Sequence, residues 1–217
     1  MKLLDLCCCA GGASMGYHRA GFTVKGVDID PQPNYPFEFV QTDCFEYLAD
    51  HYQEFDAIHA SVPCQKYSVT GNMYDNSHYP DLIAPMRNAL IATGKPYIME
   101  NVPGSPMQNY IYLDGTMFPE TLRVIRMRYF EGNILLLQPP RGKKLGYTSG
   151  RGKSYSSFDD GYYITVAGHN FRFRDGCVAM DIDWMTRNEL CEAIPPVFTE
   201  FLGRQMMTYL VNSSEYI

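Results

Sequence analysis

Short apolar runs recur through the first half of the chain, and turns rich in glycine, proline or carboxylate residues separate them. Runs of three to six residues predict buried strands, because an amphipathic helix needs a longer segment with a 3.6-residue period. We expect strands at residues 3–7, 23–27, 39–41, 55–60 and 96–99. Strands that alternate with longer segments are typical of an α/β sheet.

Helices are predicted in the segments between these strands. A glycine-rich turn at residues 10–16 leads into a helix that ends near Ala20, where Gly21 is the expected cap. Another helix covers residues 82–93 and ends at Gly94. The first amides of a helix after such a turn point at whatever lies above the strand ends. The turn therefore fits a nucleotide-like ligand, and it fits equally well a glycine required only for packing.

Capping residues mark further helices. Thr42 and Asp43 precede a predicted helix at residues 44–52, where they serve as an N-cap, as an adenine contact or as both. Near the carboxyl end, Thr186 is the expected N-cap of a helix, and Glu189 completes a capping box. A Pro-Pro pair then separates this helix from a closing helix.

Carboxylates stand at the ends of two predicted strands. Asp28 ends the second strand about 20 residues after the glycine turn, the spacing at which Rossmann-like folds hold a ribose hydroxyl pair. Asp28 is therefore the predicted ribose ligand, whereas Asp30 fits a turn equally well. Glu100 follows the fifth strand and is expected to face the same crevice; the alternative is a solvated glutamate at a strand end.

Cys64 follows the fourth predicted strand, between Pro63 and Gln65. Proline stiffens the approach, and open α/β sheets bind ligands beyond the carboxyl ends of their strands. Cys64 is therefore a candidate nucleophile; the alternative is a small apolar residue that is buried for packing. Residues 66–80 are polar and aromatic with little helical period, which indicates an active-site loop.

Composition narrows the class of protein. The 217 residues fit one α/β domain, and a hydrophobic fraction of 46% with a charged fraction of 19% is typical of soluble globular proteins. No apolar run approaches the ~20 residues of a membrane span, and an acidic residue interrupts the start of the chain, so we expect a cytoplasmic protein. The seven cysteines contain no CxxC zinc pair and are expected to be free thiols, with no metal site.

Four motifs occur in an order and spacing that resemble the cytosine-5 DNA methyltransferase family, in its compact, phage-type form. They are Asp-Leu-Cys-Cys-Cys-Ala-Gly-Gly at 5–12, Pro-Cys-Gln at 63–65, Glu-Asn-Val at 100–102 and Arg-Met-Arg-Tyr-Phe at 126–130. The resemblance extends along most of the chain. It implies a Rossmann-like S-adenosylmethionine-dependent methyltransferase fold, with a mainly parallel sheet and helices on both faces, as a single catalytic domain over residues 1–217.

The resemblance also implies a reaction on a cytosine that is flipped out of double-stranded DNA, because C6 cannot be reached within the stack. Cys64 would add to C6 as a thiolate, so that C5 becomes an enamine carbon able to take the methyl group of S-adenosylmethionine. Glu100 would hold N3 and the exocyclic amine. Arg128 would lie near O2, and Arg126 would orient a phosphate or brace Glu100.

The strand-end positions and the resemblance together give two sets of binding residues. Those expected at the cofactor are Asp5, Cys7, Ala10, Gly11, Gly12, Asp28, Ile29, Asp43, Cys44 and Pro63. Those expected at the nucleic acid are Gln65, Ser68, Asn101, Arg141, Lys143 and Lys144, with Ser68 near a phosphate.

The match departs from the family pattern at several positions. The family usually has phenylalanine and glycine where Cys7 and Cys9 stand, glycine and proline at Ser61 and Val62, and glutamine at Val124. These departures lie mainly around the expected cofactor and spare the residues of the expected chemistry.

Only residues 131–164 stand where the family inserts a target-recognition domain. The chain has a formal charge of −6, but residues 134–158 contain five basic residues, no acidic ones, four glycines and three aromatic residues. Flexible basic segments hold phosphates, which carry no base identity, so we expect low sequence specificity; the alternative is a solvated loop. There are two alternatives to methylation of DNA. One is the same reaction on cytosine in RNA, and the other is a catalytically inactive protein that binds and masks DNA.

Overall fold

The computed structural model describes residues 1–67, 79–143, 163–168 and 171–214. Seven strands form one sheet in the order β3-β2-β1-β4-β5-β7-β6. The strands are β1 Lys2–Leu6, β2 Thr23–Asp28, β3 Glu38–Gln41, β4 Ala57–Ala60, β5 Tyr97–Asn101, β6 Ile111–Leu113 and β7 Arg128–Gly132.

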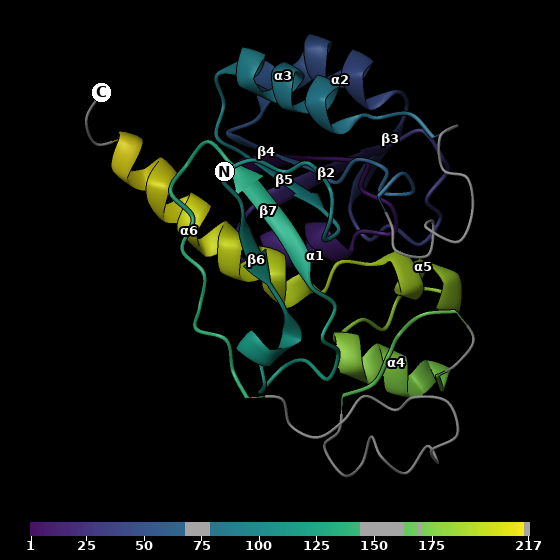
Figure 1. Ribbon diagram of the computed structural model, residues 1–217. Helices are drawn as coiled ribbons and strands as arrows, with labels where there is room; N and C mark the ends of the chain where they lie inside the picture. Colours follow the sequence, from purple (N-terminus) through teal and green to yellow (C-terminus); the bar gives the residue numbers. More distant parts are fainter. Residues whose placement is uncertain (68–78, 144–162, 169–170, 215–217) are drawn as a thin grey trace.

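Helices cover both faces of the sheet. They are α1 Gly12–Arg19, α2 Cys44–His51, α3 Ile83–Thr93, α4 Phe173–Met180, α5 Arg187–Glu192 and α6 Pro196–Ser214, with 3-10 turns at Tyr52–Glu54 and Gly115–Met117. In Figure 1, α2 and α3 lie on one face and α1 and α6 on the other. None of the helices in the described ranges is long and apolar enough to cross a membrane.

The strand order reverses direction between β1 and β4. Strands β1 to β5 pair in parallel, whereas β7 is antiparallel to both β5 and β6. From β1 the chain moves outward to β2 and β3, and then returns to the other side of β1 to form β4 and β5. At such a switch point the connections leave in opposite directions and open a crevice beyond the strand ends. The predicted mainly parallel sheet with helices on both faces is confirmed.

Two apolar layers bury the sheet. Leu4 packs with Ile58 and Met86 in the layer beneath α2 and α3. Leu3 points the other way and packs with Tyr17 in the layer of α1 and α6. Because the central parallel strands are buried on both faces, they form continuous apolar runs, which are the signal that the sequence carries.

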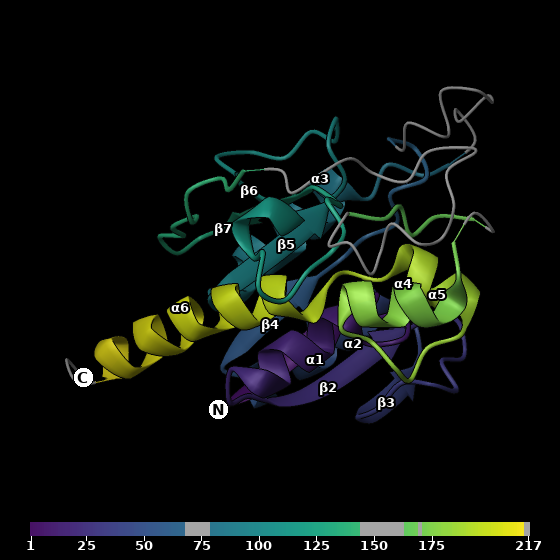
Figure 2. The ribbon, with the colours of Figure 1, turned by 90° about the horizontal axis from the view of Figure 1, so that it is seen from below.

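Helices α1 and α6 pack so closely that one position requires glycine. A Cβ at Gly16 in α1 would lie 2.1 Å from the carbonyl oxygen of Pro196 and 2.1 Å from Thr199 Oγ1. Thr199 Oγ1 donates a hydrogen bond to the Ala13 carbonyl at 2.8 Å. Figure 2 shows α6 lying along α1.

Helix ends follow the predicted capping residues. Asp43 Oδ1 accepts the backbone N–H groups of Phe45 and Glu46 at 2.8 and 3.1 Å at the start of α2. Thr186 and Glu189 form the expected capping box of α5. At Gly21 the backbone adopts φ of 102°, and the Gly21 N–H donates to the His18 carbonyl at 2.9 Å, so the helix closes as predicted.

Three elements, β6, β7 and α4, have no counterpart among the predictions. Strand β7 contains the charged residues Arg128 and Glu131, so it lacks the continuous apolar run from which the other strands were predicted. Helix α4 contains Gly176, where a Cβ would lie 2.3 Å from the ring of Phe171. Tertiary contacts therefore select residues in both elements that local propensity disfavours.

Gly16→Ala is expected to destabilise the protein. Alanine is normally favoured over glycine inside a helix by about 1 kcal/mol. Here its Cβ would overlap the backbone of α6, so we expect the free energy of unfolding to fall by about 3 kcal/mol, the upper part of the range for overpacking. Urea denaturation followed by circular dichroism measures this change.

Gly94→Ala is the matched control. Gly94 ends α3 with φ of 66°, and nothing lies within 4 Å of an added Cβ. Only the left-handed backbone is penalised there, by about 1 kcal/mol. A Gly16→Ala protein as stable as the wild type would contradict the close approach of α1 and α6.

Candidate active site

Cys64, Glu100 and Arg128 lie where β4 and β5 end and β7 begins. Cys64 is in the turn after β4, Glu100 is the penultimate residue of β5, and Arg128 is the first residue of β7. Because β7 is antiparallel to β5, its start lies beside the end of β5. The topology therefore brings together three residues that are distant in the sequence.

The Glu100 carboxyl is buried and paired. Its residue is 6% exposed, and Arg128 Nε lies 3.0 Å from Glu100 Oε1. Glu100 Oε1 has no hydrogen-bond partner among the described residues. Burial raises the pKa of Glu100, while Arg128, Ser61 and Arg126 lower it. Glu100 is therefore not the solvated strand-end residue that was the alternative.

The Cys64 thiol is half-buried and interacts with both of these charged groups. Burial raises its pKa first, the Glu100 charge raises it further, and the Arg128 charge lowers it. A nucleophilic thiolate is favoured by a nearby cation and disfavoured by burial and a nearby anion. The ionisation of the Cys64 thiol therefore depends on the charges of both Glu100 and Arg128.

Asn101 holds the turn that carries Cys64. Asn101 Nδ2 donates to the Val62 carbonyl at 3.0 Å, and its side chain is fully buried. The Tyr67 N–H closes the turn by donating to the Cys64 carbonyl at 2.9 Å. The prediction places Asn101 at the nucleic acid, and in the structure its amide contacts this turn.

Arg126 is hydrogen-bonded to the carboxyl end of α5 and to Val166. Its guanidinium donates to the carbonyl oxygens of Leu190 at 3.1 Å, Ala193 at 2.8 Å, Val166 at 3.3 Å and Cys191. Burial lowers the pKa of Arg126, and the carbonyl acceptors favour its charged form. Arg126 thus ties the end of α5 to the strand that begins two residues later.

Asp28 organises the two turns at the end of β1 and β2. Its Oδ2 accepts the Cys9 N–H at 2.9 Å and its Oδ1 accepts the Asp30 N–H at 3.1 Å. Ile29, between the two aspartates, is 64% exposed. Asp43 stands at the end of the neighbouring β3, where one of its oxygens caps α2.

Asp5 offers an acceptor without a partner. The side chain is fully buried in β1, and Ser14 Oγ donates to Oδ2. Oδ1 has no hydrogen-bond partner among the described residues, and burial raises the pKa of Asp5 to about 7. A buried acceptor of this kind fits a ligand with a donor group, because an unpaired polar atom is costly.

Cys7 and Cys44 join the turn after β1 to the start of α2. Their sulfur atoms lie 3.3 Å apart, and Cys44 Sγ also accepts the Cys7 N–H at 3.2 Å. Hydrogen bonding to Cys44, and then burial, raise the pKa of Cys7. All seven cysteines are free thiols. Within the described ranges, no group of three or more His, Cys, Asp or Glu residues is arranged to hold a metal ion.

Packing accounts for both glycines of the first turn. Gly11 has φ of 83°, and an added Cβ would lie 2.9 Å from Pro36 Cδ. A Cβ at Gly12 would lie 2.5 Å from the Ile194 carbonyl oxygen. Ala10 is buried beside them, and its carbonyl accepts a hydrogen bond from Trp184 Nε1 at 2.8 Å. The carboxyl-terminal segment therefore packs onto this turn.

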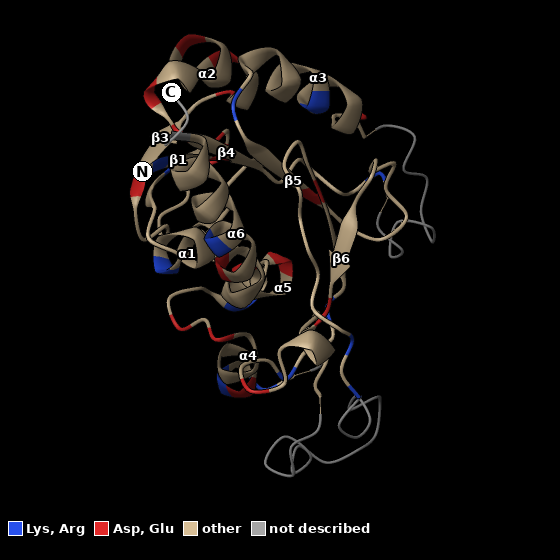
Figure 3. Cartoon of the chain, turned by 90° about the vertical axis from the view of Figure 1, so that its left-hand side faces the viewer, with Lys and Arg blue, Asp and Glu red and all other residues tan. Residues whose placement is uncertain are grey.

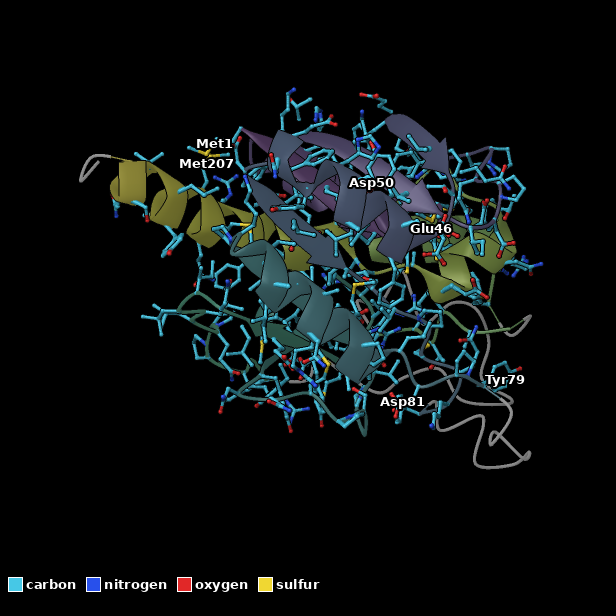
Figure 4. The ribbon with its side chains drawn as sticks, turned by 90° about the horizontal axis from the view of Figure 1, so that it is seen from above. Met1, Glu46, Asp50, Tyr79, Asp81 and Met207 are labelled. Carbon is cyan, nitrogen blue, oxygen red and sulfur yellow. The ribbon has the colours of Figure 1, made fainter. Side chains whose placement is uncertain are left out.

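The residues on either side of Cys64 are more exposed. Pro63 and Gln65 are exposed, and Lys66 Nζ lies 3.5 Å from Asp81 Oδ2. Figure 4 labels Asp81 at the start of the segment that leads into α3. Ser68 and most of the expected loop at 66–80 lie outside the described residues.

One of the expected phosphate-binding residues has a partner inside the protein. Arg141 Nε lies 3.0 Å from Oδ2 of the buried Asp114. Lys143 is exposed, whereas Lys144 lies outside the described residues, as does most of 131–164 after residue 143.

Ser61 is a residue of this site that no prediction includes. Its hydroxyl lies 2.8 Å from His59 Nε2, and Ser61 lowers the pKa of Glu100. A signal is present in the sequence, because His59 and Ser61 are polar residues two apart in an apolar strand and so project from the same face.

Three solved structures share this fold over nearly their whole length. A protein assigned as a DNA modification methyltransferase, encoded within a prophage of E. coli, has a TM-score of 0.65 at 14% identity, covering 98% of this chain and 99% of that chain. The Dnmt2 methyltransferase of S. pombe has a TM-score of 0.61 at 12% identity over 97% and 99%. The Entamoeba histolytica methyltransferase EhMeth has a TM-score of 0.59 at 12% identity over 98% and 98%. The sheet is therefore that of the α/β methyltransferases.

The family model described as C-5 cytosine-specific DNA methylase matches residues 1–109, half of the chain. This protein belongs to that family and is a cytosine methyltransferase. Membership implies DNA as the substrate and S-adenosylmethionine as the methyl donor. The comparison with curated protein sequences gave no match.

The pH at which Cys64 becomes alkylated is expected to depend on its two charged neighbours. Since Glu100 raises the pKa of the thiol and Arg128 lowers it, Glu100→Gln should move the midpoint to lower pH and Arg128→Gln to higher pH. Iodoacetamide labelling of the Cys64 peptide, followed by mass spectrometry, gives the midpoint.

Cys177 is an internal control for this measurement. Burial raises its pKa, and neither Glu100 nor Arg128 is among the groups that shift it. Its midpoint should stay constant in both variants. A Cys64 midpoint that is also constant would show that the charges of Glu100 and Arg128 do not affect the ionisation of Cys64.

Proposed function

We propose that this protein transfers a methyl group from S-adenosylmethionine to C5 of cytosine in DNA through a covalent bond between Cys64 and C6. The observation that carries this proposal is the interaction of Cys64, Glu100 and Arg128 at one edge of the sheet. Addition to a cytosine ring requires a nucleophile, a group that holds the proton at N3, and a donor near O2. These side chains supply one of each.

The reaction proceeds through addition and elimination. The Cys64 thiolate bonds to C6, and the electron pair of the C5–C6 bond makes C5 nucleophilic. S-adenosylmethionine, when bound, would supply an electrophilic methyl group on its sulfonium; C5 would take this methyl group as the S–CH3 bond breaks and the neutral thioether leaves. A base then removes the C5 proton, and the sulfur–C6 bond breaks to restore the ring and the thiolate.

Glu100 has the properties of the group that holds N3. Burial raises its pKa, so it keeps a proton more readily than an exposed glutamate and can share it with N3. Arg128, already 3.0 Å from this carboxyl, is the proposed donor to O2. Arg126 and Asn101 act as positioning residues, because their contacts hold the α5 end and the Cys64 turn.

The cofactor is placed in the crevice beyond β1 and β2. Asp28 is the proposed ribose ligand, Ile29 and Asp43 flank the adenine, and the unpartnered Asp5 oxygen faces the ammonium group. The remaining members of the cofactor set shape the crevice through their backbone and their packing: Cys7, Ala10, Gly11, Gly12, Cys44 and Pro63.

DNA is placed away from α2, whose outward side carries exposed acidic residues (Figure 3). Glu46 and Asp50, labelled in Figure 4, belong to this acidic side and would repel phosphates. Gln65 and Lys143 are exposed, while Arg141 shares its charge with Asp114. Residues 1–217 would then act as one catalytic domain with a short basic insertion at 131–164.

Cys64→Ala is expected to abolish methylation of DNA. The wild type should form a stable covalent adduct with DNA that carries 5-fluorocytosine, because fluorine at C5 blocks the elimination step. Denaturing gel electrophoresis detects the adduct, and transfer of labelled methyl groups measures turnover. Methylation by Cys64→Ala would reject the covalent mechanism. An adduct with RNA but not with DNA of the same sequence would move the substrate to RNA, and no adduct with either would favour the masking function.

The protein is expected to read little sequence. Lys143→Gln together with Lys144→Gln should weaken binding to all DNA sequences equally and reduce the salt dependence of log Kd by about 1 for each lysine, since phosphate contacts carry no base identity. Arg141 is left unchanged because its removal would unpair the buried Asp114. Bisulfite sequencing should show methylation at a short motif, and a strict site of four or more base pairs would contradict this expectation.

A further inference from the structure

Tyr35 joins the loop after β2 to helix α1 and strand β1 through two hydrogen bonds. Tyr35 OH lies 2.7 Å from Ser14 Oγ, and Ser14 Oγ donates to Asp5 Oδ2. The three side chains come from the loop at 29–37, from α1 and from β1. Tyr35, Ser14 and Asp5 are together called the Tyr35 anchor below.

The protons of the Tyr35 anchor all point toward Asp5. Ser14 and Asp5 are fully buried, and Tyr35 is 9% exposed. A hydroxyl has a single proton, and the Ser14 proton is donated to Asp5, so Ser14 Oγ can only accept from Tyr35. The Tyr35 O–H is therefore the donor. A chain of hydrogen bonds that ends on a carboxyl group in a buried place is stronger than an isolated bond between neutral groups.

Two glycines make room for the Tyr35 ring. A Cβ at Gly26 in β2 would lie 2.3 Å from Tyr35 Cζ and 2.4 Å from the Tyr35 hydroxyl oxygen. The same Cβ would lie 2.7 Å from Cys8 Sγ, and a Cβ at Gly11 would lie 3.0 Å from Tyr35 Cδ2. The ring therefore packs directly against the turn at residues 8–11.

This turn holds the Asp28 carboxylate. The Cys8 N–H donates to the Val27 carbonyl at 3.2 Å, and the Cys9 N–H donates to Asp28 Oδ2 at 2.9 Å. The turn at residues 8–11 therefore sets the direction in which Asp28 presents its oxygens. A change in the position of the turn would move the carboxylate with it.

The loop that carries Tyr35 is also attached at a second place. Asn34 Nδ2 donates to both carboxylate oxygens of Glu189, the capping residue of α5, at 3.0 Å. The Tyr35 N–H donates to the Gln32 carbonyl at 3.0 Å. Since these bonds do not involve the Tyr35 hydroxyl, its removal should alter the fit of the loop against the turn without releasing the loop.

We propose that Tyr35 is a positioning residue for the cofactor, because its hydroxyl, bonded through Ser14 to Asp5, fixes the turn from which the Cys9 N–H holds Asp28. This inference rests on the proposed role of Asp28 at the ribose. A carboxylate that is already oriented loses less entropy when a ligand binds. Tyr35 therefore acts on the ribose contact without touching the ribose.

The hydroxyl is the part of Tyr35 that carries this role. The ring lies near Phe37 and Phe39, with centroids 5.8 and 5.7 Å apart, and these contacts need no polar atom. A phenylalanine at position 35 would keep them and would leave Ser14 without its donor. Tyr35→Phe is therefore the variant that isolates the hydrogen bond.

The first test compares the binding of S-adenosylhomocysteine and its 2′-deoxy derivative. The first ligand has both ribose hydroxyls that Asp28 is proposed to hold, and the second lacks one, so the wild type should prefer the first. Tyr35→Phe should weaken S-adenosylhomocysteine binding about fivefold, the factor expected for one hydrogen bond, and should weaken binding of the 2′-deoxy derivative by less than about twofold. Isothermal titration calorimetry measures both affinities. An unchanged preference in a folded Tyr35→Phe protein would contradict the inference.

The second test observes the turn itself and requires no ligand. Trp184 is the single tryptophan of the chain, and its Nε1 donates to the Ala10 carbonyl at 2.8 Å. Its indole N–H therefore gives one signal in ¹⁵N-labelled protein, which needs no further assignment. Tyr35→Phe should shift this signal because Ala10 lies within the turn. A signal at the wild-type position would show that the Tyr35 hydroxyl does not fix the turn.

Tyr163→Phe is the matched control. Tyr163 is fully buried, and its hydroxyl has no hydrogen-bond partner among the described residues. This variant should leave both affinities and the Trp184 signal unchanged. Equal losses in Tyr163→Phe and Tyr35→Phe would reject the inference, because they would show a general effect of removing a buried phenol.

Ser14→Ala interrupts the Tyr35 anchor from the side of α1 and keeps the Tyr35 ring. It should weaken S-adenosylhomocysteine binding at least as much as Tyr35→Phe. The double variant should bind like Ser14→Ala alone, because the second change removes no further bond to Ser14. Additive losses would show that the two residues act separately. Thermal denaturation verifies that each variant is folded, and if Tyr35→Phe is not, Ser14→Ala takes its place in the first two tests.

Asp28→Asn separates this inference from the proposed function. It should remove the preference for S-adenosylhomocysteine over the 2′-deoxy derivative. If the preference stays, the ribose is not held by Asp28, and the proposed placement of the cofactor is wrong together with the role of Tyr35. If Asp28→Asn loses the preference while Tyr35→Phe and Ser14→Ala keep the wild-type affinities, the placement of the cofactor stands and only the role of Tyr35 is rejected.

Discussion

Burial of the Glu100 carboxyl is the constraint on which the site depends. A carboxylate that is nearly excluded from water costs several kcal/mol unless it is paired and hydrogen-bonded. Arg128 can pair with it only because β7 runs antiparallel beside β5, and β4, which precedes Cys64, pairs with β5 on the other side. The contacts that allow Glu100 to be buried are therefore the same contacts that bring Cys64 beside it.

Strand β7 is held by polar contacts at both ends. At its start, Arg126 binds carbonyl oxygens at the end of α5, so the carboxyl-terminal segment is fastened to the site. Near its other end, the buried Glu131 accepts from Arg87 Nη2 of α3 at 2.8 Å and from the Gln108 N–H at 2.6 Å. Removing one partner of a buried ion pair costs more than the pair itself contributes. The position of Arg128 therefore depends on residues in α3 and α5.

The turn after β1 shows how packing and ligand binding share the same residues. The glycines of this turn are required because Pro36 and Ile194 approach them, and the Asp28 carboxylate is engaged by backbone N–H groups of two turns. These internal contacts preorganise the crevice, which reduces the entropy that a ligand loses on binding. A glycine-rich turn in a sequence is thus evidence for close backbone approach, by a ligand or by the protein itself.

The sequence by itself determined the parallel part of the sheet, the helices between its strands, the helix caps and the positions of Cys64, Glu100 and Arg128 in recognisable motifs. These features depend on local apolar periodicity, capping chemistry and short spacings, all of which are written along the chain. Only the tertiary structure decided that β7 is a strand, that Arg126 and Asn101 bond to backbone carbonyls, and that hydrogen bonds join Tyr17, His59 and Ser61. Each of these depends on a polar group finding its partner on a different element, and no local pattern specifies which distant element will supply that partner.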